Sequence, residues 1–449
     1  MAADRRIYDP TVPTRSMINQ KKIVWSLFGN VVDIAIGFGT VMLITRLYSE
    51  ETAGQWFVFV AIFSLLANLR EGFVQNGLVK YSVGTTHDQR DRVYKTNLIV
   101  NLLLELFISA VALTLFQFFR WYQLDTLFLF YPLYSIPYSI YRWIFVVHRS
   151  QLRVEKSTFM NVTFLTVLAS GAWFMYMHRL DITAMVLTLG AASMSAALVG
   201  FFSINFSSIL FSSFDTTIFW QLVRYGKHGI LRELTGTIST RINIFLTAGL
   251  LSYTQTAYLG VAQRYLMLLL VPNTAFQALL YPVLVKIANS QNTELLKEEF
   301  ENQVSKLLGL MMLVAVMITL ASPFVIETLH GSSYLPAVGL LAVSLLTVAL
   351  FSPFGSAFGS VVNALDKPNL NSRIVIVNSA INVTLSYLLI NTIGLYGAVI
   401  APFMTELFGF VWTGRIIRMD ANISYRACFE RIPYHYGHWI KKIKLSNAP

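Results

Sequence analysis

The stretch RELTGTISTRIN, at residues 232–243, carries charged and hydroxyl side chains inside a run that is otherwise apolar enough to cross a membrane. When its residues are placed at 100° intervals, the apolar ones gather in one narrow arc and the polar ones cover more than half of the helix. An ionisable side chain at membrane depth costs about 3 kcal/mol or more. This helix is therefore predicted to turn its polar surface toward a hydrated cavity or other helices, and not toward lipid.

Arg241 is the residue of this stretch with the sharpest chemical prediction. It is expected near mid-depth, and Glu233 lies eight residues away, about 12 Å along the axis, so neither can neutralise the other. A partner for Arg241 must come from another helix or from a ligand. Arg232 lies near the end of the span, where a long side chain can reach the membrane interface.

Other apolar segments also carry polar residues at spacings of three and four, which place them on one face of a helix. Asn30, Asp33 and Gly37 share such a stripe. For each of these groups the alternative is a hydrogen bond or ion pair between packed helices. The residues predicted to line a central cavity are Arg241, Arg264, Arg142, Asn243, Asn30, Gln277, Asp33, Glu71 and Glu406.

The whole chain has the composition of a polytopic membrane protein. Of its 449 residues, 55% are hydrophobic and only 13% are charged, and the mean hydropathy is +0.57. Apolar runs of about 20 residues, enough to span a bilayer core, recur from end to end. We predict an all-α protein with about twelve membrane-spanning helices, at residues 23–45, 54–79, 96–119, 124–147, 158–178, 182–203, 229–251, 257–285, 305–327, 337–363, 374–391 and 395–417.

A weak internal repeat divides these helices into two sets of six. LYSEETAG joins the first two spans, and LLSYTQTAYLG joins the seventh and eighth. The predicted parts are an N-terminal segment (1–22), an N-lobe (23–203), an amphipathic linker (204–228), a C-lobe (229–417) and a basic, aromatic tail (418–449). Residues 286–304 form a second amphipathic segment, expected, like the linker, on the inner membrane surface.

Lysine and arginine are distributed unevenly between the two sides of the predicted membrane protein. The odd-numbered connections hold only Arg46, Arg120 and Arg179, whereas the N-terminal segment, the even-numbered connections and the tail hold most of the 34 basic residues. Basic residues favour the cytoplasmic side. Both termini are therefore predicted to be cytoplasmic, and the net charge of +11 requires no nucleic-acid partner.

Several kinds of chemistry have no counterpart in the sequence. It contains no phosphate-binding GxxxxGK[ST] motif, and its seven histidines lack metal-ligand spacing. The lone cysteine, Cys428, excludes an intramolecular disulfide and a cysteine-rich metal site. We predict no cofactor, no metal and no enzymatic activity.

Three longer segments carry a resemblance to a known family. They are FGNVVDIAIGFGTVMLITRLYSEETAGQWFVFVAIFSLL, TRINIFLTAGLLSYTQTAYLGVAQRY, and GSSYLPAVGLLAVSLL with SVVNALDKPNLNSRIVIVNSAINVTLSYLLI. Over about 23–418 the chain resembles the Wzx-type flippases, the polysaccharide-transporter branch of the multidrug/oligosaccharidyl-lipid/polysaccharide (MOP) exporter superfamily. Members often have an Asp-Arg pair where this chain has Thr240-Arg241, so a role for that aspartate is unsupported here. Twelve spans, not fourteen, argue against the lipid II flippases.

The resemblance implies a V-shaped, MATE-like transporter with alternating access. It would flip a polyprenyl-pyrophosphate-linked oligosaccharide, such as an O-antigen, capsule or exopolysaccharide unit, to the outer leaflet of a bacterial inner membrane. Arg241, Arg264 and Arg142 are the predicted pyrophosphate ligands. Asp33, with Glu71 and Glu406, would bind a coupling H⁺ or Na⁺ or act in gating. The partners are the lipid-linked glycan and the bilayer, and the protein is expected to act as a monomer.

Two other functions compete with that of a flippase. A cation-coupled multidrug antiporter of the same superfamily would use Asp33 and Glu406 for organic cations. Within the spans five acids face five arginines, which leaves the sign of the cavity charge open. A polymerase or membrane glycosyltransferase would need a sizeable outer loop, whereas the longest predicted outer connection has about ten residues.

Overall fold

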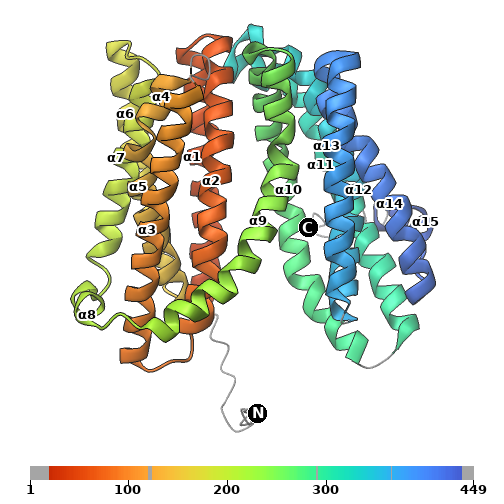
Figure 1. The fold of residues 1–449 in the computed structure, drawn as a ribbon. Coiled ribbons are helices and arrows are strands. Elements are labelled where there is room, and N and C mark those ends of the chain that lie inside the picture. Colours follow the sequence, from red (N-terminus) through yellow and green to blue (C-terminus); the bar gives the residue numbers. More distant parts are fainter. Residues whose placement is uncertain (1–19, 120–123, 290–291, 366, 437–449) are drawn as a thin grey trace, which may run out of the picture.

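The computed structural model describes residues 20–119, 124–289, 292–365 and 367–436, and this part of the chain is helical throughout, with no strand. Figure 1 shows two helical bundles, with α9 and α10 running between them. The long helices are α1 (Gln20–Leu47), α2 (Glu50–Ser82), α3 (His87–Phe119), α5 (Tyr131–Ser150), α6 (Val154–His178), α7 (Thr183–Phe201), α9 (Thr216–Leu250), α10 (Tyr253–Asn289), α11 (Thr293–His330), α12 (Pro336–Ala364), α13 (Pro368–Ile393) and α14 (Gly397–Ala421).

These helices correspond to the twelve predicted spans, which confirms the predicted all-α membrane fold. The fourth span begins with the short helix α4 (Asp125–Leu129), which ends just before α5. Eight segments of the described chain are long and apolar enough to cross a membrane, the last of them covering both α13 and α14. Helices α5, α9 and α10 are not among these segments, and they carry Arg142, Arg241 and Arg264.

The N-lobe, α1 to α7, has an aromatic core between α2, α4 and α5. The rings of Phe63 and Tyr134 stack with centroids 4.2 Å apart, and Phe59 meets Phe128 edge to face at 5.1 Å. Such pairs add to the stabilisation that comes from burying their area. This core places Arg142, two turns beyond Tyr134, next to α2.

The C-lobe consists of the second half of α9 and of α10 to α14, and α15 (Tyr425–Glu430) packs against its helix α11. The buried carboxylate of Glu301, on α11, accepts hydrogen bonds from the backbone amide of Ser424 (3.1 Å) and from Arg431 (2.7 Å). This contact anchors the start of the predicted tail. The rest of the tail (437–449) and most of the predicted N-terminal segment (1–19) lie outside the described residues.

The predicted linker, residues 204–228, is not a separate surface helix in the structure. It contains α8 (Phe206–Phe211), and then α9 begins at Thr216 and continues without a break through residue 228 to Leu250. Asp215 caps α9 by accepting from the amides of Thr217 (2.8 Å) and Ile218 (3.1 Å). The first part of α9 packs closely on α2, because a Cβ at Gly229 would lie 1.9 Å from the carbonyl oxygen of Gly72.

The second amphipathic segment, 286–304, is likewise part of longer helices. Most of it forms the end of α10 and the first turns of α11. Leu296, Phe300 and Val304 of its apolar stripe are buried, whereas Leu295 is exposed. The three buried side chains therefore pack against neighbouring helices inside the C-lobe. The segment that carries them also lengthens α10 and α11.

The two ends of the molecule are distinguished by their connections. The basic end holds residues 83–86, 151–153, 202–215, 365 and 367, and the short-loop end holds residues 48–49, 179–182, 251–252 and 331–335. At the short-loop end, Arg46 of α1 donates to carbonyl oxygens at the end of α11, including that of Leu329 at 3.0 Å. His330 hydrogen-bonds with the hydroxyls of Thr45 (2.7 Å) and Tyr265 (2.9 Å). The contacts of Arg46 and Thr45 join the two lobes at this end, and Tyr265 holds His330 from within the C-lobe.

Candidate functional site

A cavity of about 870 Å³ lies between the two lobes. Its walls come from α1, α2 and α5 of the N-lobe and from α9, α10, α12, α13 and α14, with single residues of α6 and α7. The volume falls in the range of sites for sizeable small molecules. Its ionisable lining residues are Asp33, Arg142, Arg241, Arg264 and Glu406.

Six of the nine predicted site residues line this cavity. They are the five ionisable residues above and Asn243. The described lining does not include Asn30, which is exposed on α1, or Gln277 of α10. It does not include Glu71 either, which lies directly behind Arg142.

Arg142 is held by Glu71 in a two-point ion pair. Its Nε donates to Oε1 of Glu71, and its Nη2 donates to Oε2, both at 3.1 Å. The arginine side chain is 28% exposed and the glutamate 15%. This forked geometry is the strong form of an arginine–carboxylate contact. Arg142 therefore reaches the cavity with its charge already balanced.

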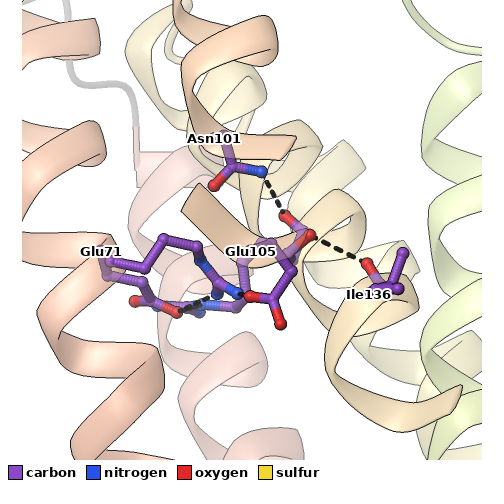
Figure 2. Close-up of polar contacts among 7 residues, drawn as sticks. Glu71, Asn101, Glu105 and Ile136 are labelled. Atoms are coloured by element: carbon purple, nitrogen blue, oxygen red, sulfur yellow. Dashed lines mark hydrogen bonds and ion pairs between the residues drawn. The ribbon is translucent and has the colours of Figure 1, made fainter. Parts of the chain in front are cut away.

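A second buried ion pair lies deeper in the N-lobe. Arg70 of α2 pairs with Glu105 of α3, and both side chains are almost completely buried. Ser109 also donates to Glu105 at 3.1 Å, and Arg70 lies 3.7 Å from Glu71. Figure 2 shows Glu71, Glu105 and Asn101 grouped around these contacts. The partner of Arg70 follows only from the packing of α3 on α2.

Asp33 has a neutral hydrogen-bonding partner. Its Oδ1 accepts from Nδ2 of Asn161 at 2.6 Å, and Oδ1 of Asn161 accepts from the hydroxyl of Tyr141 at 2.6 Å. This chain connects α1, α6 and α5. It orients the carboxylate at the N-lobe wall while leaving it on the cavity.

The C-lobe arginines differ from those of the N-lobe. Within the described part of the chain, neither Arg241 nor Arg264 forms an ion pair. The Arg264 guanidinium lies over the ring of Phe38, 5.6 Å from its centroid, and a Cβ at Gly37 would come within 0.8 Å of Nη2. Gly37 thus leaves the space that this guanidinium occupies. Arg241 and Arg264 line the same cavity, so both are available to one multiply charged anion.

Some lining residues were missed by the sequence reasoning. Asn378, Ser379 and Asn382 of α13 face the cavity. The spacing of four between the two asparagines was the available signal. Among the described residues, no group of three or more His, Cys, Asp or Glu is placed to hold a metal ion.

Residues 43–339 match the model of a family described as "Polysaccharide biosynthesis protein". No curated protein sequence matches the chain.

Several solved structures share the fold. An inward-facing multidrug resistance MATE family transporter of the MOP superfamily matches with a TM-score of 0.70 and 17% identity, over 89% of this chain and 98% of that one. The lipid II flippase MurJ, in an inward closed conformation, matches with a TM-score of 0.67 and 15% identity, over 96% and 94%. A MOP superfamily transporter from Pyrococcus furiosus matches with a TM-score of 0.61 and 16% identity, over 88% and 94%. At these identities the matches show the fold, which this chain shares with transporters and a flippase.

Proposed function

Since this chain belongs to the polysaccharide biosynthesis protein family and has the MOP transporter fold, we propose that it flips a polyprenyl-pyrophosphate-linked oligosaccharide across the membrane. The glycan would be a repeat unit of an O-antigen, a capsule or an exopolysaccharide. The protein would lie in a bacterial inner membrane with the basic end and both termini in the cytoplasm, as its lysine and arginine distribution favours.

The observation that carries this proposal is the contrast between the two pairs of arginines. Arg70 and Arg142 are neutralised by Glu105 and Glu71, whereas Arg241 and Arg264 carry no ion pair within the described residues and line the cavity. A cation withdrawn from water without a partner is costly, and an anionic ligand removes that cost. Guanidinium groups suit phosphate oxygens because they can donate two parallel hydrogen bonds. Arg142, predicted as a third ligand, is bound to Glu71 and contributes less to the proposed site.

The proposed substrate also fits the direction of transport. A pyrophosphate head carries negative charge, and a negative-inside potential favours outward movement by about 2.3 kcal/mol per charge per 100 mV. Asp33 remains the proposed site for a coupling H⁺ or Na⁺, because its carboxylate faces the cavity and accepts a hydrogen bond from Asn161. The protein would act as a monomer, since the cavity lies within one chain.

Substitution of the cavity arginines tests the proposal. In cells that lack the native gene, Arg241→Ala and Arg264→Ala should each reduce export of the lipid-linked glycan strongly. Loss of a hydrogen bond to a charged group costs about 1.5–3 kcal/mol, which is about 10- to 150-fold in affinity. Arg426→Ala is the control, because Arg426 is exposed on α15 and pairs with Glu430 away from the cavity. Unchanged export in both cavity variants would refute the pyrophosphate site.

A cation-coupled multidrug antiporter is the second candidate, favoured by the carboxylates of Asp33 and Glu406 in the same cavity. If Asp33→Asn abolishes resistance to a cationic drug and leaves glycan export intact, this function replaces the first. If the same substitution lowers glycan export and leaves drug resistance unchanged, the antiporter is excluded.

A further inference from the structure

The two walls of the cavity differ in how their polar groups are satisfied. On the N-lobe side, Arg142 is paired with Glu71, and Asp33 accepts from Asn161. On the C-lobe side, three further groups besides the arginines have polar atoms without a partner in the described chain. Two of the three groups are buried amide oxygens, and a buried polar group without a hydrogen bond costs about 1–3 kcal/mol, so they are expected where a ligand completes them.

Asn243 is the most buried of these groups. It lies on α9 two residues after Arg241, is only 5% exposed, and lines the cavity. Its Oδ1 atom has no hydrogen-bond donor among the described residues. A side chain so deeply buried gains little from bulk water, so its oxygen stays without a partner unless the amide turns toward an occupant of the cavity that it borders.

Asn378 and Glu406 continue this wall onto α13 and α14. The Oδ1 atom of Asn378 is buried and has no donor within the described chain. Gly409 keeps α14 close to this amide, because a Cβ there would lie 2.6 Å from Nδ2 of Asn378. Glu406, one turn before Gly409, lines the cavity and forms no ion pair or hydrogen bond within the described residues.

The helices that carry these groups are fixed to one another. The hydroxyls of Ser239 and Ser379 hydrogen-bond across the contact between α9 and α13. Asn382 also donates to the backbone carbonyl of Ser239 at 3.3 Å. Neighbouring polar residues of α13 are thus used for packing, whereas Asn378 is left for the cavity. The wall is therefore prepared for a ligand before one binds.

We propose that Asn243, Asn378 and Glu406 form a carbohydrate subsite that takes the sugar attached to the pyrophosphate. Two amide oxygens and a carboxylate are hydrogen-bond acceptors, and they match the hydroxyl and acetamido N–H donors of a sugar. The inference rests on the proposed function, because Arg241 and Arg264 on the same wall would hold the pyrophosphate.

The opposite wall complements this subsite. Tyr138 and Phe57 of the N-lobe, both partly exposed, line the cavity with aromatic rings. The C–H faces of a sugar ring are apolar and pack on such rings, while the hydroxyls at the ring edge require acceptors. The sugar would thus lie with its polar edge on the C-lobe and its apolar face on the N-lobe. The pyrophosphate and the attached sugar would both stay bound to the C-lobe while the two lobes move relative to each other.

The test compares two lipids that differ only in the sugar. The full chain in lipid nanodiscs is titrated with a short-chain polyprenyl pyrophosphate and with the same lipid carrying one N-acetylhexosamine, and each Kd is measured. The wild type should bind the sugar-bearing lipid more tightly. The ratio of the two Kd values should fall about 2- to 10-fold, the value of one hydrogen bond, in each of the variants Asn243→Leu, Asn378→Leu and Glu406→Gln. The Kd for the sugar-free lipid should stay within about twofold.

Controls separate this inference from the proposed function. Asn391→Leu, on α13 outside the cavity lining, removes an amide that donates to the carbonyl of Tyr387 and should leave both Kd values unchanged. Asn378→Ser repeats the test should the leucine variant fail to fold. A wild type that does not distinguish the lipids, or variants that weaken both equally, would overturn the carbohydrate subsite alone. If Arg241→Ala and Arg264→Ala both leave the Kd for the sugar-free lipid unchanged, the pyrophosphate site is overturned.

Discussion

Gly54 offers a direct way to change the contact between the lobes. It lies on α2 at the short-loop end, and a Cβ there would be 1.8 Å from the carbonyl oxygen of Tyr253, on α10, and 2.4 Å from its carbonyl carbon. An ordinary van der Waals contact of a Cβ begins at 3.4 Å. The obstacle is backbone, so no side-chain rotation relieves it. Gly54→Ala therefore requires one helix to move by more than 1 Å relative to the other.

The expected magnitude follows from this overlap. Overpacking at a close contact costs about 1–3 kcal/mol. Because α2 and α10 belong to different lobes, the cost falls on the state in which the lobes touch at the short-loop end, and not on a state in which they separate there. The equilibrium should shift about 5- to 150-fold toward the state open at this end.

Cysteine labelling measures this shift. Thr40 lines the cavity, so a Thr40→Cys variant in a Cys428→Ser background reports access to it. A membrane-impermeant maleimide added at the short-loop side should label this cysteine faster when Gly54→Ala is present. Gly249→Ala is the matched control, because Gly249 lies at the same end of α9 and its added Cβ would meet no atom within 4 Å.

The control also accounts for the general stabilisation of a helix when alanine replaces glycine, about 0.5–1 kcal/mol. If the folded Gly54→Ala variant is labelled at the same rate as the control, the close approach of α2 and α10 does not limit opening, and the reasoning is refuted.

Three further predictions follow from individual contacts. Arg46→Ala removes the hydrogen bonds to the end of α11 and should speed the same labelling about fivefold or less; an unchanged rate would show that these bonds do not hold the lobes together. Gly37→Ala should displace the Arg264 guanidinium, because the added Cβ would lie 0.8 Å from its Nη2. The Kd for a polyprenyl pyrophosphate should then rise about tenfold, and an unchanged Kd would count against Arg264 as a ligand. Glu105→Leu should cost about 3 kcal/mol, seen as a lower melting temperature in detergent, because it leaves the buried Arg70 with only the longer contact to Glu71. Arg70→Leu with Glu105→Leu should recover most of this loss, and a double variant as unstable as the single one would contradict the explanation.

The predicted fold followed from local patterns. Each span needs about 20 apolar residues, and the bilayer allows few other ways to satisfy the backbone. Polar stripes predicted which faces of the helices meet, and Asp33, Arg241 and Arg264, which lie on such faces, line one cavity. A residue's position around its own helix depends only on its number in the chain.

The state of each charged group depended on the tertiary structure. Arg142 and Arg241 look alike in the sequence, but Glu71 of a neighbouring helix neutralises Arg142, while Arg241 has no ion pair in the described chain. Likewise, only the packing of α2 on α3 joins Arg70 to Glu105. Helical periodicity determines which side chains share a face. An ion pair between helices also requires the right relative depth and rotation of two helices, which are set by packing across many residues.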